Sequence, residues 1–447
     1  MQEKKFSKWT LLAMGVGSVV GAGVVTLIGQ AIGITGYSAV LAYAFAVLLG
    51  FLYNVPILFV SSAVTLDGGN YTLINTVLGK RWGGIFIICF FLFLPGVALY
   101  AVSLGGYVQS LLPNMPVWIT ATVVLTVFYL TNLVGVAVAG KIQNVMSILL
   151  IVGLATFIIM GLGNADIGLI TNMQDPLFAI DGAKGFFSAA FLLMFSTYGM
   201  YAIAYLSRHV KKPRAAVPFA IFGTTLIIAV LYVGVAIVAA TVLPHDTVAF
   251  QPLTFVAREI MSTPLFVFFM IAGPFMVLAT TTNSMYAMYT EPLYKATCTG
   301  WLPKSLGKTN RFGTPWIITT IIYLCTLIPV VLQWDTGTIT NAVLLVDLGL
   351  GILMMTALAK IPKRYPQAWQ NRTVLRHMPT GIYYVFIGLA YMVQAVIIYN
   401  SILSIKPYIV IATIITVLFA LVYSHFRMKT TEITVDVLGE AEAEAED

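Results

Sequence analysis

The residues in this sequence best suited to chemistry form two short segments, each in the middle of an apolar run. The first is Val19-Val20-Gly21-Ala22-Gly23, and the second is Phe195-Ser196-Thr197-Tyr198-Gly199. Because glycine weakens a helix by about 1 kcal/mol relative to alanine, we expect a helix break in each segment. A helix that begins again at Gly21-Ala22-Gly23 would present free amides and the positive end of its dipole to a carboxylate.

The second segment would supply the complementary chemistry. Unwound carbonyls at Phe195 and Ser196 would accept hydrogen bonds from an ammonium group, and Tyr198 would close over a substrate or stack on an organic cation. Gly199 completes this break. An α-amino acid carries both charged groups, so it fits the two segments together. Close packing of helices through small residues is the alternative explanation for the glycines of the first segment.

A second group of polar residues suggests a coupling or cation site. Thr281 and Ser284 lie in a polar run, residues 280–284, whose hydroxyls would coordinate sodium or, alternatively, bond back to carbonyls one turn earlier. Asp347 is the one carboxylate that we place deep in an apolar run. An acid in that position would be a substrate partner or proton carrier, or would have a structural role. We expect the four histidines, His209, His245, His377 and His425, to be interfacial polar residues.

The sequence lacks the motifs of other functional classes. The three cysteines, Cys89, Cys298 and Cys325, have no metal-type spacing, so we expect no disulfide framework, no metal site and no cofactor. No nucleotide-binding loop and no catalytic constellation occurs, which excludes a self-contained ATP-driven pump and leaves no catalytic residue to name. A selectivity filter or ring of charge is also missing, so a channel is not favoured.

The elements that position these segments are membrane helices. Of the 447 residues, 59% are hydrophobic and only 9% are charged, against roughly 25% charged residues in soluble domains. The apolar residues fall in runs of about 20, the length that crosses a bilayer as a helix. We therefore predict an all-α membrane protein with twelve spans, near residues 9–33, 37–64, 84–111, 116–138, 142–163, 185–207, 217–243, 263–290, 314–333, 338–360, 380–402 and 406–426.

The distribution of charge predicts the orientation of these spans. With twelve spans, all but three of the 24 Lys and Arg residues fall on the side of the N-terminus, so both termini should be cytoplasmic and the protein should lie in the cell membrane. Topology explains the basic pI, and no nucleic-acid partner is implied. We expect residues 1–8 to be a cytoplasmic N-terminus, 9–430 one transmembrane domain, and 431–447 an acidic disordered tail.

The two predicted breaks occupy corresponding places in two sets of five spans. Paired interruptions of this kind indicate an inverted repeat with a binding site at the midplane. We predict a 5+5 arrangement with broken helices 1 and 6, in which residues 9–163 form the first repeat and 185–360 the second. Helices 11 and 12, residues 380–426, would lie outside this core.

Four motifs in order resemble those of the amino acid, polyamine and organocation (APC) transporter superfamily, of the amino acid permease type. The segment 17–25 is similar to the family's G-x-I-I-G-[SA]-G-I-F, and 65–71 to its P-x-x-G-G-x-Y. Residues 209–218, HVKKPRAAVP, resemble E-V-K-N-P-x-x-x-I-P, and 293–303 resemble L-Y-A-M-A-R-D-G-x-L-P. The departures are Phe59 and His209 where the family has acids, Glu291 where it has Arg, and Leu150 where many members have Lys. The resemblance implies the 5+5 fold and alternating access, with rewired cytoplasmic charge pairs.

We therefore expect a secondary transporter, a permease or exchanger, of a neutral amino acid. The alternatives are an organic amine or polyamine transporter of the same fold, and a sensor or scaffold subunit without turnover. Its partners would be the small-molecule substrate and membrane lipid, and the protein itself would be a monomer or a homodimer. Proton, sodium and exchange coupling all stay open.

Overall fold

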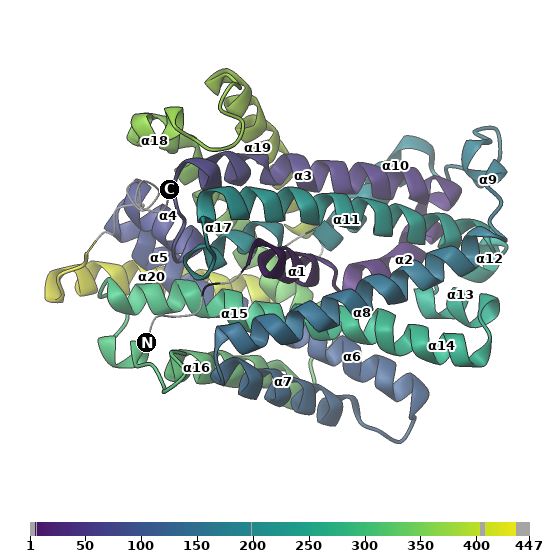
Figure 1. Cartoon of the computed structure of the whole chain (residues 1–447), viewed down its shortest axis with the longest axis horizontal. Coiled ribbons are helices and arrows are strands. Elements are labelled where there is room, and N and C mark those ends of the chain that lie inside the picture. The colour runs from purple at the N-terminus through teal and green to yellow at the C-terminus, as the bar shows by residue number, and fades with distance from the viewer. Residues whose placement is uncertain (1–4, 6, 198, 403–406, 435–447) are drawn as a thin grey trace.

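The regular elements of the protein are helices (Figure 1). The computed structural model describes residues 5, 7–197, 199–402 and 407–434, and no strand occurs in this part of the chain. The elements in the region of the first predicted repeat are α1 (Lys8–Val19), η1 (Gly23–Leu27), α2 (Ile28–Thr35), η2 (Gly36–Ser38), α3 (Ala39–Ala63), α4 (Gly69–Val77), α5 (Lys80–Phe90), η3 (Phe91–Gly96), α6 (Val97–Leu111), α7 (Val117–Leu133) and α8 (Val136–Leu162).

The remaining elements repeat the pattern of long helices joined by short ones. They are α9 (Gly168–Thr171), α10 (Gly182–Met194), η4 (Phe195–Thr197), η5 (Met200–His209), α11 (Pro213–Thr241), α12 (His245–Val248), α13 (Leu253–Ile260), α14 (Thr263–Met270), η6 (Ile271–Phe275), α15 (Met276–Cys298), η7 (Lys304–Gly307), α16 (Trp316–Val331), α17 (Thr336–Arg364), α18 (Pro366–Gln370), α19 (Thr380–Ile402) and α20 (Pro407–Thr430). Pro95 lies in η3, a 3₁₀ segment, and Pro274 lies in η6, a π-helical segment. Proline has no N–H to donate, which explains both irregular turns.

Several of these helical segments are long and apolar enough to cross a membrane. Seven qualify among the described residues: Lys8–Ala63, Lys80–Gln109, Val136–Leu162, Gly182–His209, Pro213–Thr241, Thr263–Cys298 and Ile409–Thr430. The first contains two of the predicted spans, because the chain turns at Gly36, where φ is 70°. Three shorter apolar helices are Val117–Leu133, Trp316–Val331 and Thr380–Val396. The protein is therefore a multi-pass helical membrane protein, and the exact number of twelve spans stays a prediction.

Loops at one end of the helix bundle contact each other. Lys295 Nζ pairs with Asp67 Oδ2 at 2.8 Å, and Arg214 donates hydrogen bonds to the carbonyls of Ser62 and Asn371. The helices α4 and α18 lie at this end in Figure 1. Asp67, Arg214, Lys295 and Asn371 belong to loops that alternate along the sequence in the predicted topology, and Ser62 lies at the end of α3, just before the first of these loops.

A separate set of loops meets at the opposite end, where α9, α12 and α13 lie in Figure 1. There the Tyr37 amide donates to the Leu177 carbonyl at 3.0 Å, and the Phe250 amide donates to the Gly29 carbonyl at 2.8 Å. Connections that are far apart in the sequence thus meet at opposite ends of the bundle.

The start of the predicted tail is packed against the bundle. Ile433 is buried, and the Thr434 amide donates to the Thr299 carbonyl at 3.1 Å. Residues 431–434 therefore differ from the disorder that the acidic composition suggested, because an apolar side chain anchors them. Residues 435–447 lie outside the described part of the chain.

The helix α15 runs through the centre of the bundle. Every residue from Val277 to Leu293 is buried, although this stretch includes five consecutive hydroxyl or amide side chains at 280–284. Polar groups tolerate such burial only when they find hydrogen-bond partners inside the protein. The helices that pack most extensively against α15, chiefly α8, α6 and α1, therefore surround the polar centre of the molecule.

Candidate functional site

The first helix is interrupted within the predicted segment. The α-helix α1 ends at Val19, and Val20 adopts an extended conformation (φ −74°, ψ 92°). The chain then resumes as the π-helical segment η1 at Gly23, with no side chain of the described residues capping it at Ala22. The first amides of a helix have no partner inside that helix. This break therefore presents amides around Gly21, Ala22 and Gly23 that suit a carboxylate.

The second interruption separates α10 from η5. The helix α10 ends at Met194, the short 3₁₀ turn η4 follows, and Gly199 takes a left-handed conformation with φ 94°. A methyl group on Gly199 would also lie 2.8 Å from the Ser18 carbonyl oxygen. Both the backbone conformation and the close approach require glycine here. Tyr198 lies outside the described residues.

The two breaks touch each other, and one buried tyrosine bonds to both. A methyl group on Gly23 would lie 2.9 Å from the Ser196 Cα, so the two backbones are in close contact. The Tyr232 hydroxyl lies 3.2 Å from the Val19 carbonyl oxygen and 3.0 Å from the Ser196 carbonyl oxygen. One hydroxyl proton is thus shared between two broken helices. Tyr232 was missed by the sequence analysis, and its only local signal is a polar atom in an otherwise apolar run.

A pocket of about 610 Å³ lies beside the breaks. Aromatic and apolar side chains dominate its lining, which consists of Phe93, Gly96, Leu99, Tyr100, Phe195, Gly199, Tyr201, Ala202, Met285, Tyr289, Thr340 and Val343. Phe195 and Gly199 of the predicted site belong to this lining, and Val19, Val20, Gly21, Ala22 and Gly23 do not. Gly21 nevertheless adjoins the pocket, because a methyl group there would lie 3.1 Å from the Tyr100 ring.

A second pocket of about 320 Å³ shares two walls with the first. Phe93 and Tyr201 line both pockets, and the second also contacts Tyr53, Asn70 and Tyr205. Asn70 belongs to α4, which lies at the end of the bundle where the N-terminal helix begins. The two pockets together lead from the breaks toward that end.

The predicted cation site faces the end of α1. The Thr281 hydroxyl oxygen lies 2.8 Å from the Gly17 carbonyl oxygen, 3.1 Å from that of Val20 and 3.0 Å from that of Val277. The Ser284 hydroxyl lies 3.4 Å from the Met14 carbonyl oxygen. Thr281 therefore bonds one turn back along its own helix, which is one of the two expected alternatives, and also contacts the end of the broken helix. The sodium alternative stays a prediction.

A chain of buried amides continues this contact between helices. The Asn283 side chain donates to Gln143 Oε1 at 2.8 Å and accepts from Asn132 at 3.0 Å. A methyl group on Gly17 would lie only 1.8 Å from Gln143 Nε2, so this amide lies directly against α1. Leu150, where the family often has Lys, is fully buried. Neutral amides, rather than a charged group, thus link α1, α7, α8 and α15.

Asp347 lies apart from Thr281 and Ser284. It belongs to α17, which packs mainly on η3, α4, α6 and α19. Its position is one helical turn after Val343 and about one turn before Leu350, which line the two pockets. The side chain of Asp347 lies outside what the structure describes.

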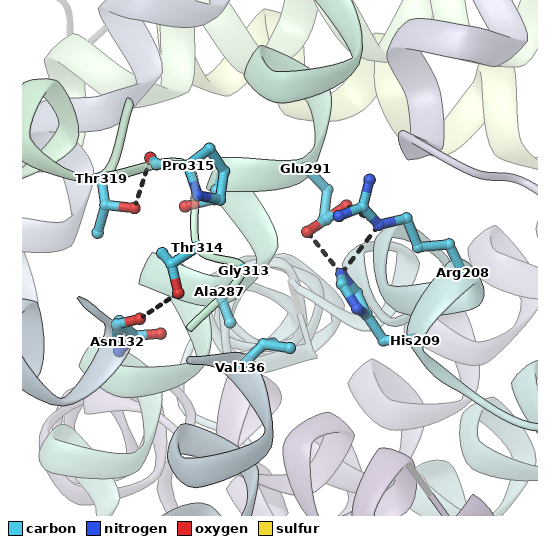
Figure 2. Close-up of a pocket in the computed structure, with 11 residues that line it drawn as sticks. Asn132, Val136, Arg208, His209, Ala287, Glu291, Gly313, Thr314, Pro315 and Thr319 are labelled. Carbon is cyan, nitrogen blue, oxygen red and sulfur yellow. Dashed lines mark hydrogen bonds and ion pairs between the residues drawn. The ribbon is translucent and has the colours of Figure 1, made fainter. Parts of the chain in front are cut away.

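A charged cluster occurs where η5 meets α15 (Figure 2). His209 Nε2 lies 2.7 Å from Glu291 Oε1, and Arg208 Nε lies 3.3 Å from Glu291 Oε2. The side chains of His209 and Glu291 are 4% and 5% exposed. His209 is therefore buried in the protein, as is His245, whose Nε2 lies 3.2 Å from the Ile32 carbonyl oxygen. Glu291 is a buried carboxylate within α15, which continues to Cys298.

The fold and the site together define a class of protein. A multi-pass helical membrane protein in which two interrupted helices meet beside a central pocket has the features of a secondary transporter. A family model described as "Amino acid permease" matches residues 6–424, nearly the whole chain, and the protein belongs to this family. Members of the family are permeases of the APC superfamily, not enzymes.

Individual relatives are distant. The chain is 26% identical over 346 residues to the branched-chain amino acid permease BcaP of Bacillus subtilis, covering 71% of this chain and 72% of that protein. It is 24% identical over 232 residues to the serine/threonine exchanger SteT of Bacillus subtilis, covering 50% and 51%. An uncharacterized protein of Methanocaldococcus jannaschii is 26% identical over 257 residues, covering 55% and 57%. The chain thus spans little more than half the length of two of these relatives.

Proposed function

We propose that the protein moves a neutral amino acid across the cell membrane by alternating access, with the substrate held between the two helix breaks. The observation that carries this proposal is the contact between the breaks. Gly23 meets Ser196, and the Tyr232 hydroxyl lies within hydrogen-bond distance of Val19 and Ser196. A rearrangement of either broken helix must therefore alter the other, which is what coupling of binding to movement requires.

The α-carboxylate and α-ammonium groups would bind at opposite breaks. The amides of Gly21, Ala22 and Gly23 would donate to the carboxylate, supported by the dipole of the helix that follows. Carbonyls at Phe195 and Ser196 would accept from the ammonium. The Ser196 carbonyl also faces the Tyr232 hydroxyl, and a carbonyl oxygen has two lone pairs, so both bonds are compatible.

The side chain of the substrate would enter the pocket beside the breaks. None of the described residues that line this pocket carries a formal charge, and Phe93, Leu99, Met285 and Val343 supply apolar surface. A charged side chain would lose its hydration there without gaining an opposite charge. We therefore favour small to medium apolar or aromatic side chains, in line with the branched-chain substrates named for BcaP.

We propose exchange or ion-independent transport, with both termini in the cytoplasm. SteT, a relative, is named an exchanger. The amide chain through Gln143 and Asn283 contains no titratable group, so it carries no proton. Thr281 and Ser284 remain the candidate residues for a sodium site, and Asp347 remains the candidate for a substrate or proton partner on α17.

An organic amine is the second candidate substrate. Tyr100, Tyr201 and Tyr289 line the pocket together with two phenylalanines, and aromatic faces attract organic cations. Asp347, one turn from the pocket lining, would then pair with the distal amine. The amino acid is favoured because it alone uses the amides of the first break.

Uptake into proteoliposomes tests the proposal. Purified protein in vesicles preloaded with unlabelled leucine should accumulate labelled leucine faster than empty vesicles do. Leucine, valine and phenylalanine should compete for this uptake, whereas glutamate, arginine and putrescine should not. Strong competition by putrescine would indicate that the substrate is an organic amine. Absence of uptake with every labelled compound would favour a non-transporting sensor or scaffold.

A further inference from the structure

We propose that residues 431–434, which follow α20, form a strap that slows the transport cycle by holding α4 against the turn after α15. The inference goes beyond the proposed function, since it assigns a control of the movement, and it rests on that function for its transport readout. The strap lies at the end of the bundle that carries α4, where α20 packs on α5 (Figure 1). This end is cytoplasmic in the proposed topology.

The strap is anchored to the turn that follows α15. The Thr434 amide donates to the Thr299 carbonyl at 3.1 Å. A methyl group on Gly300 would lie 3.0 Å from the Glu432 carbonyl oxygen, so the strap backbone lies directly on this turn. Ile433 is 3% exposed and belongs to the hydrophobic core. A buried apolar side chain and a backbone hydrogen bond both stabilise the contact.

The helix α20 has its own contacts with the same turn. The Tyr423 hydroxyl donates to the Trp301 carbonyl at 2.6 Å, and Arg427 Nε donates to the Gly300 carbonyl at 3.1 Å. Trp301 is fully buried, and its ring lies against α5, because a methyl group on Gly84 would lie 2.4 Å from it. Removal of the strap would therefore leave α20 in place.

The strap also reaches α4. Asn75 Nδ2 donates to the Thr434 carbonyl at 3.4 Å. Asn75 is buried on α4 and adjoins α5, since a methyl group on Gly83 would lie 2.6 Å from Asn75 Oδ1. Nearby, the Tyr71 hydroxyl of α4 contacts the Thr299 hydroxyl. Residues 431–434 thus strengthen an existing contact between α4 and the turn after α15.

The helix α4 supports η5, the segment that follows the second helix break. A methyl group on Gly69, the first residue of α4, would lie 1.9 Å from the Tyr205 ring, so this ring lies directly on the α4 backbone. Tyr205 belongs to η5 and lines the second pocket. Alternating access requires the broken helices to move. A strap that holds α4 in place therefore restrains η5 and slows the cycle.

The strap lies beyond the part of the chain that matches the family. The family match ends at residue 424, before the strap begins. Residues 431–434 thus add a contact to a bundle whose helices all precede them. Such an added contact is suited to setting the rate of the cycle, because it leaves the substrate site between the helix breaks unchanged.

The test compares two shortened chains in leucine exchange by proteoliposomes. A chain that ends after Thr430 lacks the strap, whereas a chain that ends after Thr434 keeps it and loses only residues 435–447. At saturating leucine, the chain without the strap should exchange roughly fivefold faster than the wild type, the factor expected when a restraint loses one hydrogen bond. The chain that keeps the strap should exchange at the wild-type rate.

Point variants of the full-length chain repeat the comparison. Ile433→Asp places a charge at the buried position, so it should release the strap and give the faster rate. Glu432→Gln, at an exposed position of the strap, is the matched control and should keep the wild-type rate.

Hydrogen–deuterium exchange of the backbone amides of α4 and η5 measures the restraint without any substrate. These amides should exchange faster in the chain that ends after Thr430 than in the chain that ends after Thr434. This result together with no leucine transport by the wild type would support the strap and count against the proposed function.

Three results would overturn the strap as a control of the cycle. The first is unchanged or slower leucine exchange in both the chain that ends after Thr430 and Ile433→Asp. The second is equal acceleration in the two shortened chains, which would place the effect in residues 435–447. The third is loss of folded protein in both strap variants, which would show a purely structural role.

Discussion

Replacing Tyr232 by Phe removes the one hydroxyl that bonds both helix breaks. The Val19 and Ser196 carbonyl oxygens, 3.2 and 3.0 Å from this hydroxyl, would then lose a buried donor. Leaving buried acceptors unsatisfied costs about 1–3 kcal/mol. If the two breaks become misaligned and binding of leucine weakens by about 1–2 kcal/mol as a result, the apparent affinity for leucine should fall roughly 5- to 30-fold.

The control for this variant is Tyr383→Phe. The Tyr383 hydroxyl is also buried and donates to one backbone carbonyl, that of Leu358 on α17, at 2.6 Å. Both variants should lower the free energy of unfolding in detergent by a similar amount, but only Tyr232→Phe should raise the KM for leucine exchange. Equal KM values in Tyr232→Phe and Tyr383→Phe would refute the idea that this hydroxyl aligns the binding site.

Three further variants probe the same region. Gly23→Ala should reduce exchange more than tenfold, because its methyl group would force the two breaks apart. Its control is Gly106→Ala on α6, where nothing lies within 4 Å of an added methyl group, and this variant should exchange leucine normally in the same vesicles. Thr281→Val should destabilise the protein by about 1 kcal/mol, because it loses the hydrogen bonds to α1. Thermal unfolding with and without sodium measures this loss. If sodium raises the unfolding temperature of the wild type but not of the variant, Thr281 belongs to a cation site instead. Asp347→Asn should keep the shape of the pH profile of exchange, and a flattened profile would place a proton-carrying group on α17.

Much of the fold follows from local features of the sequence. The breaks at residues 19–23 and 195–199 lie where glycine and hydroxyl residues interrupt apolar runs, because helix propensity is a local property. The predicted span 263–290 stops before the charged Glu291, whereas the helix α15 runs on to Cys298. It continues because Glu291 is balanced by two basic side chains from η5, and such compensation lies outside any local window.

The site could be predicted only in part, for the same reason. The glycine-rich segment and the run of hydroxyl residues can be recognised in the sequence itself. The role of Tyr232 cannot, because it depends on hydrogen bonds to carbonyls 213 and 36 residues away. The His209–Glu291 contact joins residues 82 positions apart. The departures from the family pattern flagged both residues, but only their positions in space show that they pair.

Competition by two truncated analogues of leucine tests the central claim most directly. Isopentylamine lacks the carboxylate, and 4-methylpentanoate lacks the amine. If one break binds the carboxylate and the other binds the ammonium, each analogue should inhibit leucine exchange roughly 10- to 150-fold less well than leucine does, since a charge-assisted hydrogen bond contributes about 1.5–3 kcal/mol. Inhibition by isopentylamine equal to that by leucine would contradict the account, because the amides of the first break would then bind nothing that the transporter requires.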